Sequence, residues 1–186
     1  MVASSAGHLL DSRLLDGPQV RALRERLIAR LCEPDLLAAA GIRTRSTGAA
    51  RFRPGSYHNG SVCPIDTGVI ADGLRRHGHA GQAADLEQRI LDACAAAGGF
   101  AEFFRGERDD RLTINQHTVD TTVDGLPNRL EQPPQAIQGW TVTRVWRILR
   151  HAMPSRRRTT PTCVAQPGAP TPPLRSIAAQ PIRLAA

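Results

Sequence analysis

Apolar residues recur at helical spacing through most of the first 150 residues of this chain. The clearest run begins at Pro18, which suits a first helical position because its missing N–H needs no partner there, and continues with regularly spaced leucines. The pattern predicts helices over about 18–31, 34–41, 64–78, 80–97 and 135–150. The small residues Gly68, Ala71 and Gly73 in the third of these would let a neighbouring helix approach closely.

Strand-like composition is confined to residues 118–123. This segment is isolated among helical patterns, so we expect one short strand at most and an all-α fold class. Two long stretches, about 42–63 and 99–134, lack periodicity altogether. Loops of that length are uncommon in compact domains unless they line a site, so these stretches are the natural places to look for chemistry.

Residues 151–186 differ from the rest of the chain in composition. They hold half of the 14 prolines, three consecutive arginines and few large apolar residues, which is typical of a disordered tail. They hold five arginines and no acidic residue, which leaves 19 basic against 17 acidic residues, a net charge of +2, in residues 1–150. The near-neutral body predicts no nucleic-acid partner.

The cysteines and the apolar runs argue against a metal site, disulfides, a signal peptide and a membrane span. No two of the four cysteines stand at zinc-ligand spacing, and we expect free thiols rather than disulfides or a metal centre. The early leucines are interrupted by Asp11 and Arg13, so they do not form a signal peptide. No apolar run approaches the length that crosses a bilayer, and we expect no membrane partner.

A polar, glycine-broken segment leads into the helix predicted at 64. It reads Ser-Tyr-His-Asn-Gly-Ser-Val-Cys-Pro-Ile-Asp over 56–66. A second segment, Ala-Glu-Phe-Phe-Arg-Gly over 101–106, follows the Gly98-Gly99 helix stop, and Pro-Gln-Ala stands at 134–136. Loops on a rigid scaffold carry binding and catalytic residues more often than the scaffold itself.

Together with Gly-His-Leu-Leu at 7–10 and Gly-Ile-Arg-Thr at 41–44, these segments resemble, in order, motifs of the bacterial glycogen-debranching amylo-α-1,6-glucosidases. The family reads Ser-Tyr-His-Asn-Gly-Ser-Val-Trp-Pro-His-Asp, Pro-Glu-Leu-Phe and Pro-Gln-Ala at the corresponding places. The resemblance covers roughly 7–150 and implies an (α/α)6 toroid of inner and outer helices. That unit needs a chain about twice as long as this one, so residues 1–150 resemble its C-terminal part.

The resemblance implies hydrolysis of α-glucosidic bonds in glycogen-like or other α-glucan substrates, as part of a longer or split enzyme. Inverting hydrolysis needs one carboxylic acid to protonate the leaving oxygen and one carboxylate to activate water. Glu102 matches the family's glutamate and is our candidate general base. No acidic residue before position 56 matches a family motif, so we expect the general acid to lie outside this chain. No metal, no organic cofactor and a cytoplasmic setting are implied.

Six residues are predicted to bind the substrate: Tyr57, His58, Asn59, Asp66, Gln135 and Trp140. His58 and Asn59 each offer a donor and an acceptor to sugar hydroxyls. Structural alternatives stay open for several of them. His58 and Asn59 also suit a turn, Asp66 suits a helix N-terminus through the helix dipole, Trp140 suits a core, and Glu102 suits a solvated loop.

Three departures from the family pattern favour other interpretations. Cys63 replaces the family's tryptophan, Ile65 replaces a common histidine and Ala101 replaces a proline. Aromatic residues make up only 4% of the chain, which is a low content for a site that stacks sugars on aromatic rings. The alternatives are a non-catalytic glucan-binding or assembly fragment, completed by the missing N-terminal part of the toroid as a separate chain, and a degenerate remnant. We expect no turnover from the isolated chain, because one carboxylate cannot supply both proton transfers.

Overall fold

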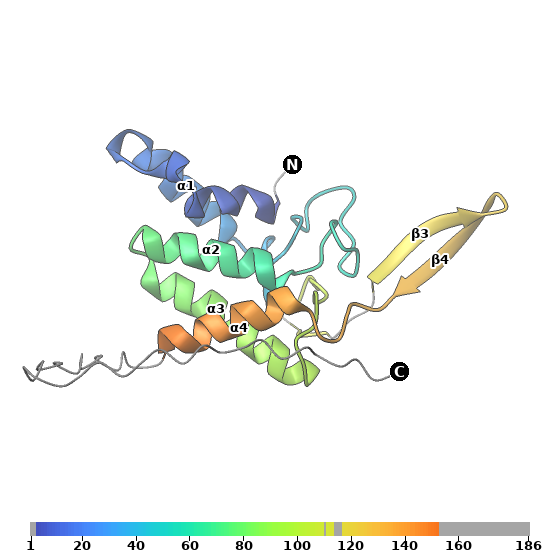
Figure 1. The fold of residues 1–186 in the computed structure, drawn as a ribbon. Helices are drawn as coiled ribbons and strands as arrows, with labels where there is room; N and C mark the ends of the chain where they lie inside the picture. The colour runs from blue at the N-terminus through green and yellow to red at the C-terminus, as the bar shows by residue number, and fades with distance from the viewer. Residues whose placement is uncertain (1–2, 110, 114–116, 153–186) are drawn as a thin grey trace, which may run out of the picture. The chain divides into compact units, whose positions relative to one another are not determined.

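The computed structural model describes residues 3–109, 111–113 and 117–152 (Figure 1), and helices are the main regular structure among these residues. In chain order the elements are the 3-10 segments Ser4–Asp11 (η1), Arg13–Leu15 (η2) and Pro18–Val20 (η3), helix Arg21–Leu31 (α1), strands Leu37–Ala38 (β1) and Gly41–Ile42 (β2), helices Pro64–Arg76 (α2) and Ala80–Ala97 (α3), strands His117–Val123 (β3) and Leu126–Gln132 (β4), and helix Gly139–Ala152 (α4). None of the described helices is long and apolar enough to cross a membrane. The predicted tail lies outside the described residues from 153 onwards.

Helix α2 lies between the other helical elements and packs against η1, α3 and α4 (Figure 1). It begins at Pro64, as its sequence predicts. Its glycines allow the close approach expected of them. A Cβ at Gly68 would lie 2.5 Å from Cδ of Arg144 in α4, and a Cβ at Gly73 would lie 2.5 Å from Cβ of Leu10 in η1. A larger residue at either position would push a neighbouring element away.

Two groups of buried apolar side chains hold these elements together. The first joins η1, α1, α2 and the start of α3 through Leu10, Leu15, Ile28, Leu31, Leu36, Ile42, Ile70, Ala71, Leu74, Ala83 and Leu86. The second joins the rest of α3 to α4 and to the loops before α2 and after α3 through Ala38, Ala40, Val62, Ile90, Ala93, Cys94, Ala101, Phe104, Val145 and Ile148. Burial of this apolar surface is the main contribution that stabilises the fold.

Helix α3 ends where the sequence predicts. Gly98 adopts a left-handed φ of 64°, which glycine tolerates at a helix end, and its N–H donates to the carbonyl of Ala95. Glu87, buried on the same helix, accepts a hydrogen bond of 3.0 Å from Nε of Arg75. An ion pair therefore joins α2 to α3 in addition to their apolar packing.

The helix predicted over 34–41 is wrong. These residues form turns and the paired strands β1 and β2. The physical reason is Arg43, whose guanidinium donates to the carbonyls of Pro34 at 2.9 Å and Leu37 at 2.6 Å. In a helix those carbonyls would instead accept from N–H groups four residues later.

The last helix begins later than predicted, at Gly139 instead of position 135. The backbone before it is already engaged elsewhere. The N–H of Gln138 donates to the carbonyl of Phe100 at 2.8 Å, and the carbonyl of Gln135 accepts from the N–H of Glu102 at 3.0 Å. Helix α4 also extends to Ala152, so the first two residues of the predicted tail are helical.

The single short strand predicted at 118–123 is also wrong, because β3 and β4 form an antiparallel hairpin of seven residues each. Its two-residue turn consists of Asp124, with φ 52°, and Gly125, with φ 77°. Left-handed backbone at both positions is the type I′ turn, which matches the twist of the strands and favours Asp-Gly. This dipeptide is the sequence signal that predicts the hairpin.

Candidate active site

Two loops meet beside the N-terminal end of α2. Val62, just before the helix, pairs with Phe104, and the two N–H···O distances are both 2.8 Å. Val62 also pairs with Arg43. This ladder lays segment 56–62 alongside segment 101–106, and we call the two segments together the rim. Residues far apart in the sequence therefore share one edge of the helical layer.

Tyr57 and Glu102 lie in direct contact on the rim. The Tyr57 hydroxyl donates to Oε1 of Glu102 at 2.9 Å. The Tyr57 ring packs edge-on against Phe103, with centroids 5.2 Å apart, and against His58 at 4.5 Å. Burial, and then the hydrogen bond to Glu102, raise the pKa of Tyr57 to about 12. The hydroxyl of Tyr57, the only tyrosine of the chain, is thus neutral and hydrogen-bonded to Glu102, the candidate base.

The segment before α4 orients Glu102 from the other side. The N–H of Glu102 donates to the carbonyl of Gln135 at 3.0 Å, and the N–H of Gln135 lies 3.4 Å from Oε2 of Glu102. The neighbouring carbonyl of Ala101 accepts from the Thr141 hydroxyl at 2.9 Å. Each carboxylate oxygen of Glu102 therefore has a donor, while the residue stays partly exposed.

Glycines allow the two rim segments to touch. A Cβ at Gly106 would lie 1.9 Å from the carbonyl oxygen of Gly60. Gly60 itself has φ 154°, and a Cβ there would lie 2.6 Å from the carbonyl oxygen of Arg53. Both clashes are with backbone atoms, which cannot rotate aside as a side chain does. Only glycine fits at these two positions.

Arg43 fixes the loop that follows the rim. Its side chain is fully buried, at 0% exposure. Nε donates to the carbonyl of Gly106 at 3.0 Å, and the terminal nitrogens donate to the carbonyls of Pro34, Leu37 and Glu107. A buried guanidinium is costly unless its N–H groups have acceptors, and here carbonyls from two segments provide them. The sequence predictions did not single out Arg43, since arginine is mostly exposed.

Asp66 lies in the first turn of α2 and is joined to η1. Its carboxylate accepts from the Ser4 hydroxyl at 2.9 Å and contacts Nε2 of His8 at 3.0 Å. Burial raises the pKa of Asp66, but the hydrogen bonds from His8 and Ser4 outweigh burial, and the pKa lies below its usual value. The hydrogen bond to Asp66 raises the pKa of His8. Sequence reasoning missed this pair, although the Gly-His motif at 7–8 was the available signal.

Three predicted substrate-binding residues remain to be placed: His58, Asn59 and Trp140. His58 is exposed beside Tyr57. Asn59 supports its own loop, since its Nδ2 donates to the Ser56 hydroxyl at 3.1 Å. Trp140, in the first turn of α4, is 61% exposed, and its side chain makes no hydrogen bond or ring contact with the described residues. The structure thus brings together Tyr57, His58, Gln135 and Glu102, whereas Trp140 does not join them.

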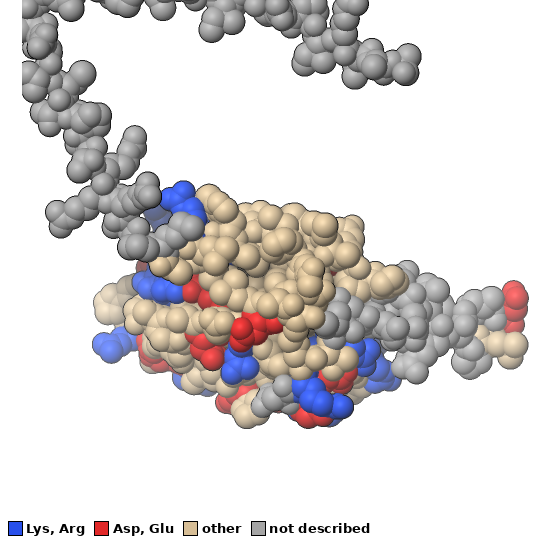
Figure 2. All heavy atoms as spheres, turned by 90° about the horizontal axis from the view of Figure 1, so that it is seen from below, with Lys and Arg blue, Asp and Glu red and all other residues tan. Residues whose placement is uncertain are grey.

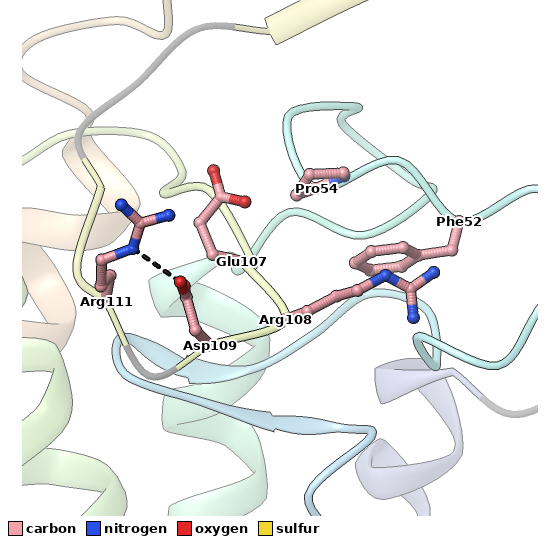
Figure 3. A pocket seen from close by; sticks show the side chains of 6 residues that line it. All are labelled: Phe52, Pro54, Glu107, Arg108, Asp109 and Arg111. Carbon is pink, nitrogen blue, oxygen red and sulfur yellow. Dashed lines mark hydrogen bonds and ion pairs between the residues drawn. The ribbon is translucent and has the colours of Figure 1, made fainter.

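An open pocket lies beside the rim but includes neither Tyr57 nor Glu102. Figure 3 shows its lining, which consists of Phe52, Pro54, Glu107, Arg108, Asp109 and Arg111. The Arg108 guanidinium lies 4.7 Å from the centroid of the Phe52 ring, and Nε of Arg111 donates to Asp109 at 2.7 Å. The charged groups of the lining are therefore engaged, and Glu107 pairs with Arg105 at 2.6 Å, so we assign the pocket no chemical role.

Thiols and metal ligands do not contribute to this site in the part of the chain that the structure describes. No cluster of histidine, cysteine, aspartate or glutamate there is arranged to hold a metal. Cys32, Cys63 and Cys94 are free thiols, and Cys163 lies outside the described residues. Burial is the main cause that raises the pKa of Cys63 to about 12 and of Cys94 to about 11, which makes both thiols poor nucleophiles.

Comparisons with known proteins agree with a glycosidase fold. The family model of the mannosylglycerate hydrolase MGH1-like glycoside hydrolase domain matches residues 12–119. The crystal structure of the GH63 mannosylglycerate hydrolase from Thermus thermophilus in complex with Tris superposes with a TM-score of 0.52 and 18% sequence identity. The match covers 81% of this chain but only 30% of that protein. A search of curated proteins gave no significant match.

Proposed function

Because the chain belongs to the family of MGH1-like glycoside hydrolase domains, we propose that it supplies the general-base side of a glycosidase active site. Its helices have the fold of part of an (α/α)6 toroid. In this proposal Glu102 is the general base, and Tyr57 and His58 contact the sugar together with Asn59 and Gln135. The observation that carries the proposal is the 2.9 Å hydrogen bond from Tyr57 to Glu102.

The contacts of Glu102 suit a base that must be held in one orientation. In inverting hydrolysis the base carboxylate takes a proton from the water that attacks the sugar carbon. Tyr57 donates to Oε1, and its raised pKa keeps the hydroxyl protonated at neutral pH. The approach of the Gln135 N–H to Oε2 fixes the other oxygen.

The general acid is proposed to come from the rest of the toroid. Two other carboxylates lie near the rim, but Ser4 and His8 engage Asp66 in a structural link to η1, and Arg105 pairs with Glu107 at 2.6 Å. A single available carboxylate provides one of the two proton transfers. The chain spans 30% of the length of the superposing structure, which leaves room in a complete toroid for the second carboxyl group.

An α-glucan is the first proposed substrate, because the rim motifs resemble those of glycogen-debranching glucosidases. Mannosylglycerate is the second, because the matching family model and the superposing structure both belong to mannosylglycerate hydrolases. Both substrates are glycosides, so the same general-base step serves either. The two differ in the sugar, which is glucose in one and its C2 epimer mannose in the other, and in the group attached to it.

The test is hydrolysis by this chain combined with a polypeptide that carries the remaining toroid helices. Glycogen, isomaltose and mannosylglycerate are offered separately, and sugar release is followed together with the anomer first formed. We expect release of the inverted anomer, which Glu102→Gln lowers by about 10²–10⁴-fold, the size of a general-base contribution. Full activity of the Glu102→Gln assembly would rule out the assigned role.

A second candidate is a non-catalytic glucan-binding or assembly fragment. It is favoured by the engagement of the two carboxylates near the rim, since Ser4 and His8 contact Asp66 and Arg105 pairs with Glu107. Affinity electrophoresis of the chain in gels that contain glycogen separates the two candidates. Retardation by glycogen, combined with no hydrolysis in any assembly, would support the binding role.

A further inference from the structure

The exposed side of α4 carries a second apolar stripe. Thr141, Val145 and Ile148 are buried against the rest of the chain. The next residue after each of them is apolar and exposed, with 37% exposure for Val142, 58% for Trp146 and 47% for Leu149. With 3.6 residues per turn, positions i, i+4 and i+7 share one helix face. We call Val142, Trp146 and Leu149 the outer stripe.

The outer stripe lies directly beside the buried face of α4, which is formed by Thr141, Val145 and Ile148. A shift of one residue turns the helix face by about 100°, so the apolar surface of α4 extends well beyond the part that α2 and α3 cover. Figure 2 shows a broad area without charged side chains on one face of the molecule, with the charged groups gathered along its margins. An apolar stripe on a helix normally faces a packing partner, and the described residues provide none for the outer stripe.

Charged residues on α4 are all of one sign. Residues 139–152 include Arg144, Arg147 and Arg150 and no acidic residue. Arg144 and Arg147 contact Asp72 of α2. Arg150 flanks the outer stripe, with its guanidinium 5.1 Å from the centroid of the Trp146 ring. A second copy of this helix on the stripe would bring arginines together, whereas a helix with acidic flanks would complement them.

We propose that the outer stripe is the docking surface for an acidic-flanked amphipathic helix from the part of the (α/α)6 toroid that this chain does not contain. The inference rests on the proposed function only in taking the chain as part of a toroid. Its basis is the apolar spacing, the single sign of charge on α4 and the 30% of the superposing structure that this chain spans. The docked helix covers Trp146 and places carboxylates beside Arg150.

The two tryptophans of the chain make the proposal measurable. Trp140 and Trp146 are the only ones, both are on α4, and they are similarly exposed, at 61% and 58%. Only Trp146 belongs to the outer stripe, because six residues of helix turn Trp140 more than 100° away from it. Trp140→Phe leaves Trp146 as the reporter, and Trp146→Phe leaves Trp140 as its matched control.

The probe is a synthetic helical peptide with leucines at coiled-coil spacing and glutamate flanks, and the control peptide carries lysine instead of glutamate. We expect Trp146 to emit as a solvated indole in the dilute chain and to shift to the blue when the glutamate peptide is added. Trp140 should not shift. By anisotropy of the labelled peptide, Trp146→Gln should weaken binding by about 10- to 30-fold, the loss typical of a central interface tryptophan, and Trp140→Gln should leave it unchanged.

Several results would overturn the proposal. Equal or tighter binding of the lysine peptide would contradict the proposed charge complementarity. The absence of a shift with either peptide would show that the outer stripe is not a docking surface. A blue shift that follows the concentration of the chain alone would assign the stripe to a second copy. A blue emission of Trp146 at every dilution would mean that residues 153–186 cover it. None of these readings depends on hydrolysis, so they are separate from a failure of the proposed function.

Discussion

The rim and the outer stripe of α4 are opposite kinds of surface in one small chain. On the rim, polar side chains and backbone groups find partners within the chain, as Tyr57 with Glu102 shows. On the outer stripe, large apolar side chains such as Trp146 remain uncovered. The difference teaches that this chain pairs its own polar groups on the rim but leaves apolar surface open on α4, where we propose that a further helix docks.

The largest expected effect comes from Arg43, which supports the rim. Arg43→Met removes the buried guanidinium and leaves the carbonyls of Gly106 and Pro34 without these donors. We expect the free energy of unfolding to fall by about 3–4 kcal/mol, as measured by urea denaturation. The matched change on α4, Arg150→Met, should stay within about 0.5 kcal/mol of wild type. Equal losses in the two variants would break the contrast between the two surfaces.

A somewhat smaller effect is expected at the contact between the rim segments. Gly106→Ala places a Cβ against the Gly60 carbonyl, so the loops must separate, at a cost of about 2–3 kcal/mol. Gly81→Ala is the control, because a Cβ there meets nothing within 4 Å and alanine favours the helix by up to about 1 kcal/mol. Thermal unfolding followed by circular dichroism measures both. A stable Gly106→Ala variant would show that the rim is looser than described.

Removing the Tyr57 hydroxyl should have a moderate effect. Tyr57→Phe keeps the ring contacts with Phe103 and His58 but removes the hydrogen bond to Glu102. We expect a loss of about 1 kcal/mol in the free energy of unfolding. Trp146→Phe, on the outer stripe, should change it by less than about 0.5 kcal/mol. A larger loss at Trp146 would mean that the stripe is already covered within the chain.

The smallest effect is the pH dependence of the link between η1 and α2. The raised pKa of His8 contributes stability below its usual value of 6.5, and this is lost as pH rises through the raised value. The lowered pKa of Asp66 contributes stability above its usual pKa of 3.8, and this stability is lost as pH falls through the lowered pKa. The pair therefore stabilises most between these limits, by about 1 kcal/mol or less because His8 is exposed.

Melting temperatures of wild type and Asp66→Asn across this pH range test the link. The difference between the two proteins should be largest at about pH 4–6.5 and should shrink on both sides of that window. A difference that does not vary with pH would show that Asp66 and His8 are not coupled.

Sequence pattern predicted the elements whose cause is local. Helices α2 and α3 follow from Pro64, from apolar spacing and from the Gly98 stop. The pattern failed where distant contacts decide, because Arg43 takes the carbonyls that a helix over 34–41 would use. The hairpin also has a local cause, the Asp124-Gly125 turn, which the composition of residues 118–123 alone does not reveal.

For the site, the two motifs that carry Tyr57 and Glu102 lie in contact in the structure, and the roles of both residues in catalysis stay predictions. Spacing gave no reason to expect His8 beside Asp66, since that contact depends on how η1 packs on α2. The spacing also did not predict that the Trp140 side chain makes no contact with Glu102, because its position depends on α4 starting at Gly139.

The contact between Tyr57 and Glu102 is tested most directly by titrating the only tyrosine of the chain. Tyrosinate absorbance should rise with a midpoint at about pH 12 in the wild type, and at a lower pH in Glu102→Gln, which lacks the charge that disfavours the phenolate. Circular dichroism at each pH must show that the helices persist. A wild-type midpoint near the ordinary value for tyrosine, unchanged by Glu102→Gln, would contradict the shared rim.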